Sequence, residues 1–67
     1  MDMDIAQRRG IVERYLRRCV TYSDASIERK IARGEDAAEI ARWQAYREFT
    51  AYSAEEVAAG VLDSWLT

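Results

Sequence analysis

The fold of this chain is decided by residues 36–52, which read DAAEIARWQAYREFTAY. On a helix, with 100° per residue, the apolar side chains of this stretch fall on two sides. One side carries Ala38, Ala41, Ala45, Phe49 and Tyr52, and the opposite side carries Ile40, Trp43, Tyr46 and, a turn further on, Val57. A helix that is apolar on two sides is usually packed on two sides. The rest of the chain can cover one side, so we expect the other to face a second molecule.

The length of the chain limits the core that it can build. Its 67 residues make one small domain, and such a chain buries only about 60% of its unfolded surface. Small domains therefore rely on disulfides, metals or oligomerisation. A single cysteine, Cys19, excludes an internal disulfide, and without histidine the chain has too few ligands for a tetrahedral zinc site. We therefore expect oligomerisation, and neither a metal nor another cofactor.

The composition is that of a globular protein, with 49% hydrophobic and 33% charged residues. No apolar run approaches the roughly 20 residues that cross a membrane. The N-terminal residues MDMDI lack the basic and then apolar pattern of a signal peptide. We expect a soluble, cytoplasmic protein that has no membrane partner and keeps Cys19 reduced.

The charge is unevenly distributed along the chain. Residues 1–33 carry eight basic and five acidic side chains, and residues 34–67 carry two basic and seven acidic ones. The net charge of −2 argues against a general nucleic-acid binder. The asymmetry favours an antiparallel arrangement of the two halves, or of each half against the opposite half of a partner.

The sequence predicts an all-α fold. It has no proline and only three glycines, and it lacks β-branched alternation and Asn-Gly or Asp-Gly turns. A first helix is expected over about residues 4–33, with Asp2 or Asp4 as its cap. Its apolar stripe comprises Ile5, Val12, Leu16, Cys19, Val20, Ser23, Ile27 and Ile31. A kink near Ser23, where the polarity rises, is the alternative.

Gly34 predicts the end of this first helix, because glycine enters the left-handed conformation without strain. The turn that follows is short, which predicts an antiparallel helical hairpin. A second helix is expected over about residues 36–59. The capping-box pattern from Ser53 to Glu56 offers an alternative break within it, although Gly60 is a better stop.

The remaining segment, residues 61–67, is too short for an independent helix. It is expected to form a short helical segment docked on the hairpin or on a partner through its apolar side chains, which are Val61, Leu62, Trp65 and Leu66.

No residue pattern points to catalysis. The neighbouring carboxylates Glu55-Glu56 and Glu35-Asp36 diverge by about 100° on a helix and do not converge on one substrate. Cys19 lies on the apolar stripe, where a cysteine usually acts as a small core hydrophobe. Arg17 and Arg18 precede it, which leaves redox reactivity as a minor alternative. We expect no enzyme.

The arginines of the first half form the one charged feature of interest. Arg14, Arg17 and Arg18 share the helix face opposite the apolar stripe, and Tyr15 and Tyr22 lie between that face and the stripe. A basic face with nearby aromatics is compatible with contact to phosphate anions. It is also typical of an ordinary solvated face. A nucleic-acid-associated regulator is therefore the alternative function.

The main prediction is a non-enzymatic module for protein–protein interaction or structure, acting as a homodimer or with another protein. Two hairpins would associate into a four-helix bundle. Tryptophan and tyrosine are enriched at the energetic centres of interfaces. The candidate interface residues are Ile40, Trp43, Tyr46, Phe49, Tyr52, Val57 and Trp65.

Overall fold

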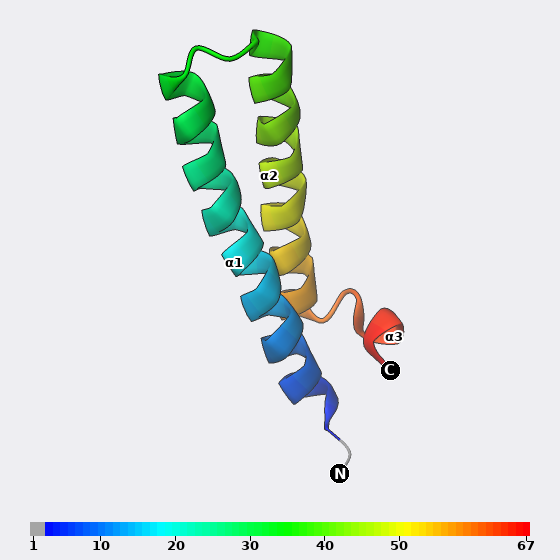
Figure 1. Ribbon diagram of the computed structural model, residues 1–67. Helices are drawn as coiled ribbons and strands as arrows, with labels where there is room; N and C mark the ends of the chain where they lie inside the picture. Colours follow the sequence, from blue (N-terminus) through cyan, green and yellow to red (C-terminus); the bar gives the residue numbers. More distant parts are fainter. Residues whose placement is uncertain (1–2) are drawn as a thin grey trace.

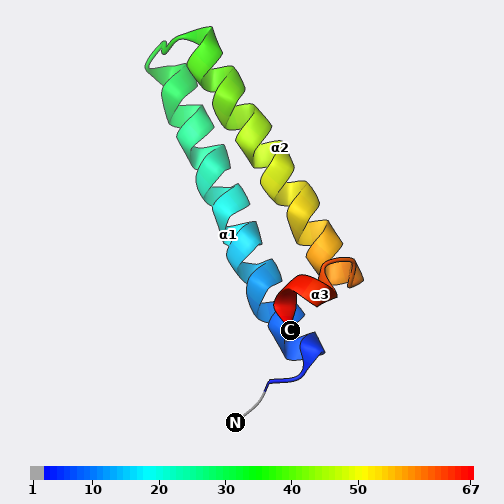
Figure 2. The ribbon, with the colours of Figure 1, turned by 90° about the vertical axis from the view of Figure 1, so that its right-hand side faces the viewer.

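The computed structural model describes residues 3–67, which form three helices: α1 (Ile5–Ala32), α2 (Ala37–Ala59) and α3 (Asp63–Leu66). Helices α1 and α2 lie side by side and antiparallel, and α3 folds back beside the N-terminal part of α1 (Figure 1, Figure 2). The all-α hairpin with a short C-terminal helical segment is thereby confirmed. The molecule is elongated, with extents of 48 × 19 × 14 Å.

Helix α1 begins at a reciprocal cap. The side chain of Asp4 accepts a hydrogen bond from the amide of Gln7 at 2.8 Å, and the side chain of Gln7 accepts one from the amide of Asp4 at 3.0 Å. Each bond satisfies an amide that the helix itself leaves without a partner. Of the two predicted caps Asp4 is therefore used, and Asp2 lies outside the described residues. The helix continues through Ser23 for 28 residues, without the alternative break there.

The turn between α1 and α2 depends on Gly34, as predicted. Its φ is 70°, and its amide donates to the carbonyl of Ile31 while the amide of Glu35 donates to the carbonyl of Lys30, both at 3.0 Å. This is the Schellman arrangement, which satisfies the last carbonyls of a helix. Asp36 then caps α2 by accepting a hydrogen bond from the amide two residues further on, at 3.3 Å.

Helix α2 passes through Ser53 and ends at Gly60, so the capping-box pattern does not start a new helix. Gly60 has φ of 83°, and the amide of Val61 donates to the carbonyl of Glu56 at 3.1 Å. A Cβ added at Gly60 would lie 3.4 Å from the guanidinium of Arg9. This distance is an ordinary van der Waals contact, so glycine is required here by the left-handed turn.

The interface between α1 and α2 is built from small residues. The buried side chains are Ser23, Ser26, Thr50, Ala54 and Val57. Two of the polar ones are satisfied locally, because Thr50 Oγ1 donates to the carbonyl of Tyr46 at 2.8 Å and Ser26 Oγ accepts from Arg29 at 3.1 Å. Small side chains let the two helices approach closely, at the cost of a small apolar core.

The predicted stripe of α1 fails at one end. Val12, Leu16, Cys19, Val20 and Ile27 are half-buried, but Ile31 is 57% exposed. Four residues beyond Ile27 the helix has turned a further 40° or so, which carries Ile31 away from α2.

A candidate interaction surface

The two apolar sides of α2 have different surroundings. Ile40 and Trp43 are half-buried toward α1, and Val57 is 3% exposed in the core. On the other side every member is exposed, which applies to Ala38, Ala41, Ala45, Phe49 and Tyr52. The chain therefore covers one side of the helix. Of the candidate interface residues, Val57 belongs to the core of the hairpin and does not lie on the exposed surface.

An open groove of about 670 Å³ runs between α1 and α2 along one edge of their contact. Both helices line it with residues spaced at i, i+3, i+4 and i+7, so that one ridge of each helix forms a wall. The lining residues are Tyr15, Arg18, Cys19 and Tyr22 from α1, and Glu39, Arg42, Trp43 and Tyr46 from α2.

Trp43, which lines this groove, is held in place by its neighbours. Its ring lies 6.3 Å from that of Tyr22 and 6.0 Å from that of Tyr46, the latter edge-on. The Nζ of Lys30 sits 5.3 Å from the centroid of the Trp43 ring, and the indole Nε1 donates to Glu39 at 3.2 Å. Edge-on aromatic contacts and a cation over an indole face are both favourable arrangements. Four separate contacts therefore fix the orientation of the indole.

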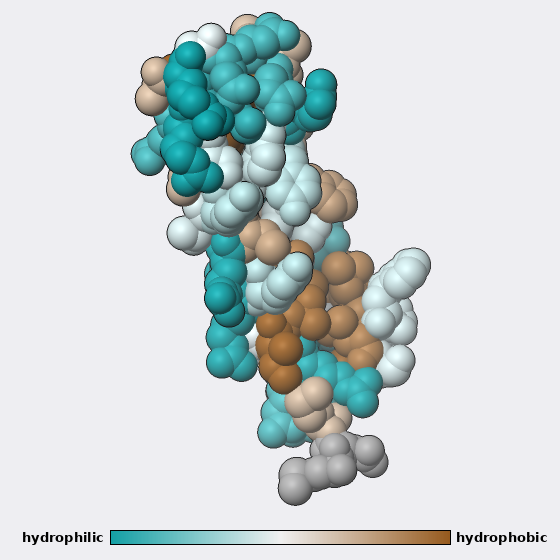
Figure 3. All heavy atoms as spheres, in the orientation of Figure 1, coloured by the Kyte–Doolittle hydropathy of each residue, from teal (hydrophilic) through white to brown (hydrophobic). Residues whose placement is uncertain are grey.

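Exposed aromatic side chains of α2 adjoin the groove. Tyr46 lines the groove and is itself half exposed, Phe49 lies three residues further on with 72% exposure, and Tyr52 follows after three more. Each such step turns the helix by about 60°, so the three rings wrap from the groove to the outer side. On the face shown in Figure 3, hydrophilic residues gather around the helix turn and hydrophobic ones in the lower half beside α3.

The side chains of the three predicted anion-contact arginines lie in different surroundings. The Nε of Arg14 donates to the carbonyl of Gly10 at 3.2 Å, and Arg17 forms an ion pair with Glu13 at 2.8 Å. Only Arg18 lines the groove. Two of the three are therefore turned back to their own helix, and their contact with an anion stays a prediction.

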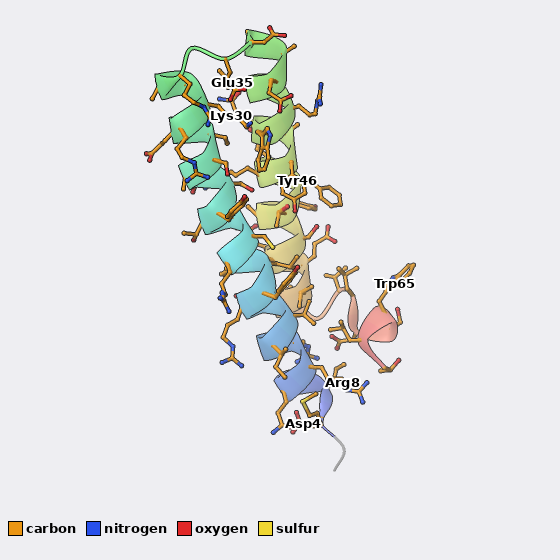
Figure 4. The ribbon with its side chains drawn as sticks, viewed as in Figure 1. Asp4, Arg8, Lys30, Glu35, Tyr46 and Trp65 are labelled. Carbon is orange, nitrogen blue, oxygen red and sulfur yellow. The ribbon has the colours of Figure 1, made fainter. Side chains whose placement is uncertain are left out.

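Helix α3 is attached to α1 by polar contacts. Arg9 forms a two-pronged ion pair with Asp63, and Arg8 donates to the carbonyl of Leu66 at 2.6 Å. The guanidinium of Arg9 holds the pKa of Asp63 below its ordinary value, through its hydrogen bonds and its charge. Trp65 is 84% exposed and points away from the hairpin (Figure 4). The predicted docking of the C-terminal segment therefore leaves its largest apolar side chain uncovered.

Ion pairs between the two halves follow the charge asymmetry of the sequence. Lys30 pairs with Glu39 at 3.6 Å, and Arg47 of α2 pairs with Asp24 of α1 at 2.9 Å. At the turn Lys30 also lies near Glu35 (Figure 4), at 3.5 Å. A hydrogen bond from Arg33 and the charge of Lys30 lower the pKa of the Glu35 carboxyl. The Arg47–Asp24 pair is exposed and contributes little free energy, whereas Lys30 is only 15% exposed. Both pairs join opposite charges of α1 and α2 in the antiparallel arrangement.

Comparison of the chain with protein-family models, curated proteins and solved structures found no match. Within residues 3–67, no helix combines the length and the apolarity that crossing a membrane requires. The sequence predicted the aromatic residues of the surface but not the groove, because the groove depends on how α1 and α2 are rotated against each other. The sequence signal that could have indicated the groove is the i, i+3, i+4, i+7 spacing of its lining residues, which starts at Tyr15 in α1 and at Glu39 in α2.

Proposed function

We propose that this chain is a non-enzymatic interaction or structural module that acts as a cytoplasmic helical homodimer, in the form of a four-helix bundle. The main observation behind this proposal is that few apolar side chains are buried and many are exposed. Among the described residues, Ala54 and Val57 are the buried hydrophobic ones. Ten large hydrophobic or aromatic side chains are exposed: Met3, Ile11, Tyr15, Tyr22, Ile31, Tyr46, Phe49, Tyr52, Val61 and Trp65.

The surface area supports this proposal. The accessible surface is 5095 Å², whereas a compact monomer of 7.7 kDa exposes about 4,300 Å². The excess reflects the elongated shape of the hairpin, which leaves ample exposed surface for the roughly 800 Å² that each partner buries in a standard interface. Large exposed apolar patches on small chains typically mark such interfaces. Pairing of two identical chains around a twofold axis is the commonest way to cover them.

The mass in solution tests this proposal. Size-exclusion chromatography with light scattering should give about twice the chain mass of 7.7 kDa at micromolar concentrations. The midpoint of thermal unfolding should rise with protein concentration, because dimerisation is coupled to folding. A well-folded species of 7.7 kDa at every concentration would overturn the proposal.

One observation favours a second candidate, a nucleic-acid-associated regulator. Arg18 lies with Tyr15 and Tyr22 on one wall of the groove, which combines a cation with rings on which bases can stack. Binding to a single-stranded oligonucleotide should then weaken steeply with salt and be lost in the triple variant R14Q/R17Q/R18Q. Absence of binding at low salt would exclude this candidate.

A further inference from the structure

The outward side of α2 is arranged symmetrically about Phe49. Two tyrosines lie three residues away on either side, two small residues lie four away, and two opposite charges lie seven away. These pairs are Tyr46 and Tyr52, Ala45 and Ser53, and Arg42 and Glu56. At 100° per residue all seven positions fall within about 120° of the helix surface. Arg42 and Glu56 each lie about 10.5 Å along the axis from Phe49.

We infer that the second copy of this chain packs on this strip, with the two α2 helices antiparallel and Phe49 on the twofold axis. The inference rests on the homodimer proposed above and specifies its register. In a twofold contact, if residue i meets residue j of the second copy, then j meets i. Antiparallel helices that cross at Phe49 bring together positions equally far from it in opposite directions.

Large and small side chains match in this register. Along the helix axis, Tyr46 lies within one residue of Ser53 of the second copy. In the same way, Tyr52 lies within one residue of Ala45 of the second copy. Each matched pair lies on the same side of the seam, at helix angles within about 20° of each other. A large ring on one helix then meets a small residue on the other, as in knobs-into-holes packing.

Charge complementarity selects the antiparallel direction. Arg42 comes level with Glu56 of the second copy, and the symmetric pair forms at the other end. The Arg42 side chain is 77% exposed and is held by Glu39 at 3.3 Å. Glu56 is half-buried, and its side chain takes part in none of the ion pairs formed among residues 3–67. A parallel pairing in the same register would oppose Arg42 to Arg42 and Glu56 to Glu56, and like charges at an interface disfavour the complex.

The same register arranges four helices with the two α2 helices in the centre and one α1 helix flanking each. The strip lies about 120° around α2 from the side that packs on α1, which is centred near Trp43, Thr50 and Ala54. The twofold axis then places both α1 helices on the same side of the α2 pair. Tyr46 belongs to both the strip and the groove, so the second copy would border the groove along its open edge.

Charge reversal tests the register with the aromatic strip intact. We expect R42E and E56R each to weaken the dimer at least about tenfold in light-scattering titrations, and R42E/E56R together to restore it. E55R is the matched control, because Glu55 lies about 100° from Glu56 around the helix. It should leave the dimer unchanged.

Disulfide trapping tests the axis directly. In a Cys19→Ser background, Phe49→Cys should give a covalent dimer on oxidation, because two cysteines on the axis of closely packed helices fall within disulfide reach. Gln44→Cys, exposed on another side of α2, should not. A monomeric wild type would overturn both the homodimer and this register. A dimeric wild type without rescue by R42E/E56R, and with Phe49→Cys trapped no faster than Gln44→Cys, would overturn the register alone.

Discussion

The two sides of α2 differ in how their large side chains are covered. On the side packed on α1 the fully buried residues are Thr50, Ala54 and Val57, and the larger Ile40 and Trp43 are half-buried, whereas the outer side leaves the rings of Phe49 and Tyr52 exposed. A surface helix normally buries its large apolar residues and exposes its small or polar ones. The difference indicates that contact between α1 and α2 sets the shape of the hairpin, while the larger apolar area of α2 remains to be buried elsewhere.

The largest expected loss of stability comes from a charge placed on the buried side of α2. Val57→Asp puts an unpaired carboxylate at a core position that is 3% exposed. Such a burial costs about 3–5 kcal/mol, a large part of what a chain this small can supply. We expect loss of most of the helical circular dichroism signal at 25 °C.

Gln44→Asp is the matched control, because Gln44 is exposed on the same helix and lies outside both the core and the aromatic strip around Phe49. It should change the free energy of unfolding by no more than about 0.5 kcal/mol. Similar unfolding of both variants would contradict the assignment of Val57 to the core.

Gly60→Ala tests how much the left-handed turn that ends α2 contributes to stability. Its left-handed conformation costs an alanine about 1–2 kcal/mol, whereas the new Cβ would only make an ordinary van der Waals contact with the Arg9 guanidinium at 3.4 Å. We expect a lower midpoint in urea unfolding. Gly34→Ala should lose about as much, because its φ is also positive, at 70°, and nothing lies within 4 Å of the added Cβ. A clearly larger loss in Gly60→Ala would contradict backbone strain as the whole cause.

The fold was predictable from the sequence because the signals that start and stop its helices are local. Gly34 predicted the end of the first helix, and the lack of proline and of strand patterns predicted an all-α fold. Both predictions depend on neighbouring residues alone, and both are confirmed. The rotation of α1 against α2 is not local. It decides that Ser23 is buried while Ile31 is exposed, and that Val57 lies in the core. Periodicity identified two apolar sides of α2 but could not say which one the first helix would cover.

Gly10→Ala tests whether the surface of α1 around Gly10 is free of contact with a second molecule. Gly10 lies inside α1, and an added Cβ would meet nothing within 4 Å. Alanine should therefore stabilise the helix by about 0.5–1 kcal/mol, raising the thermal midpoint. Ala6→Gly, on an exposed position of the same helix, should lower it. A loss of stability in Gly10→Ala would indicate that a second molecule approaches α1 there.

The smallest expected effect is confined to α3 and depends on pH. The pKa of Asp63 is held below its ordinary value of 3.8 by Arg9. The unfolded carboxyl therefore binds a proton before the folded one does. The ion pair stabilises the docked helix fully above pH 3.8, and this stability is lost as the pH falls through the lowered pKa.

An NMR titration of the Asp63 carboxyl carbon, with the Trp65 indole as a reporter of α3, measures this effect. The two signals should change together at a pH below 3.8, and Asp63→Asn should show no such step in the indole signal. A midpoint at or above 3.8 would mean that Arg9 does not hold the carboxylate. Because this loss is expected only in acid, the Arg9–Asp63 ion pair should hold α3 beside α1 at neutral pH, with Trp65 exposed. A partner that binds Trp65 at neutral pH would then meet α3 already in place against α1.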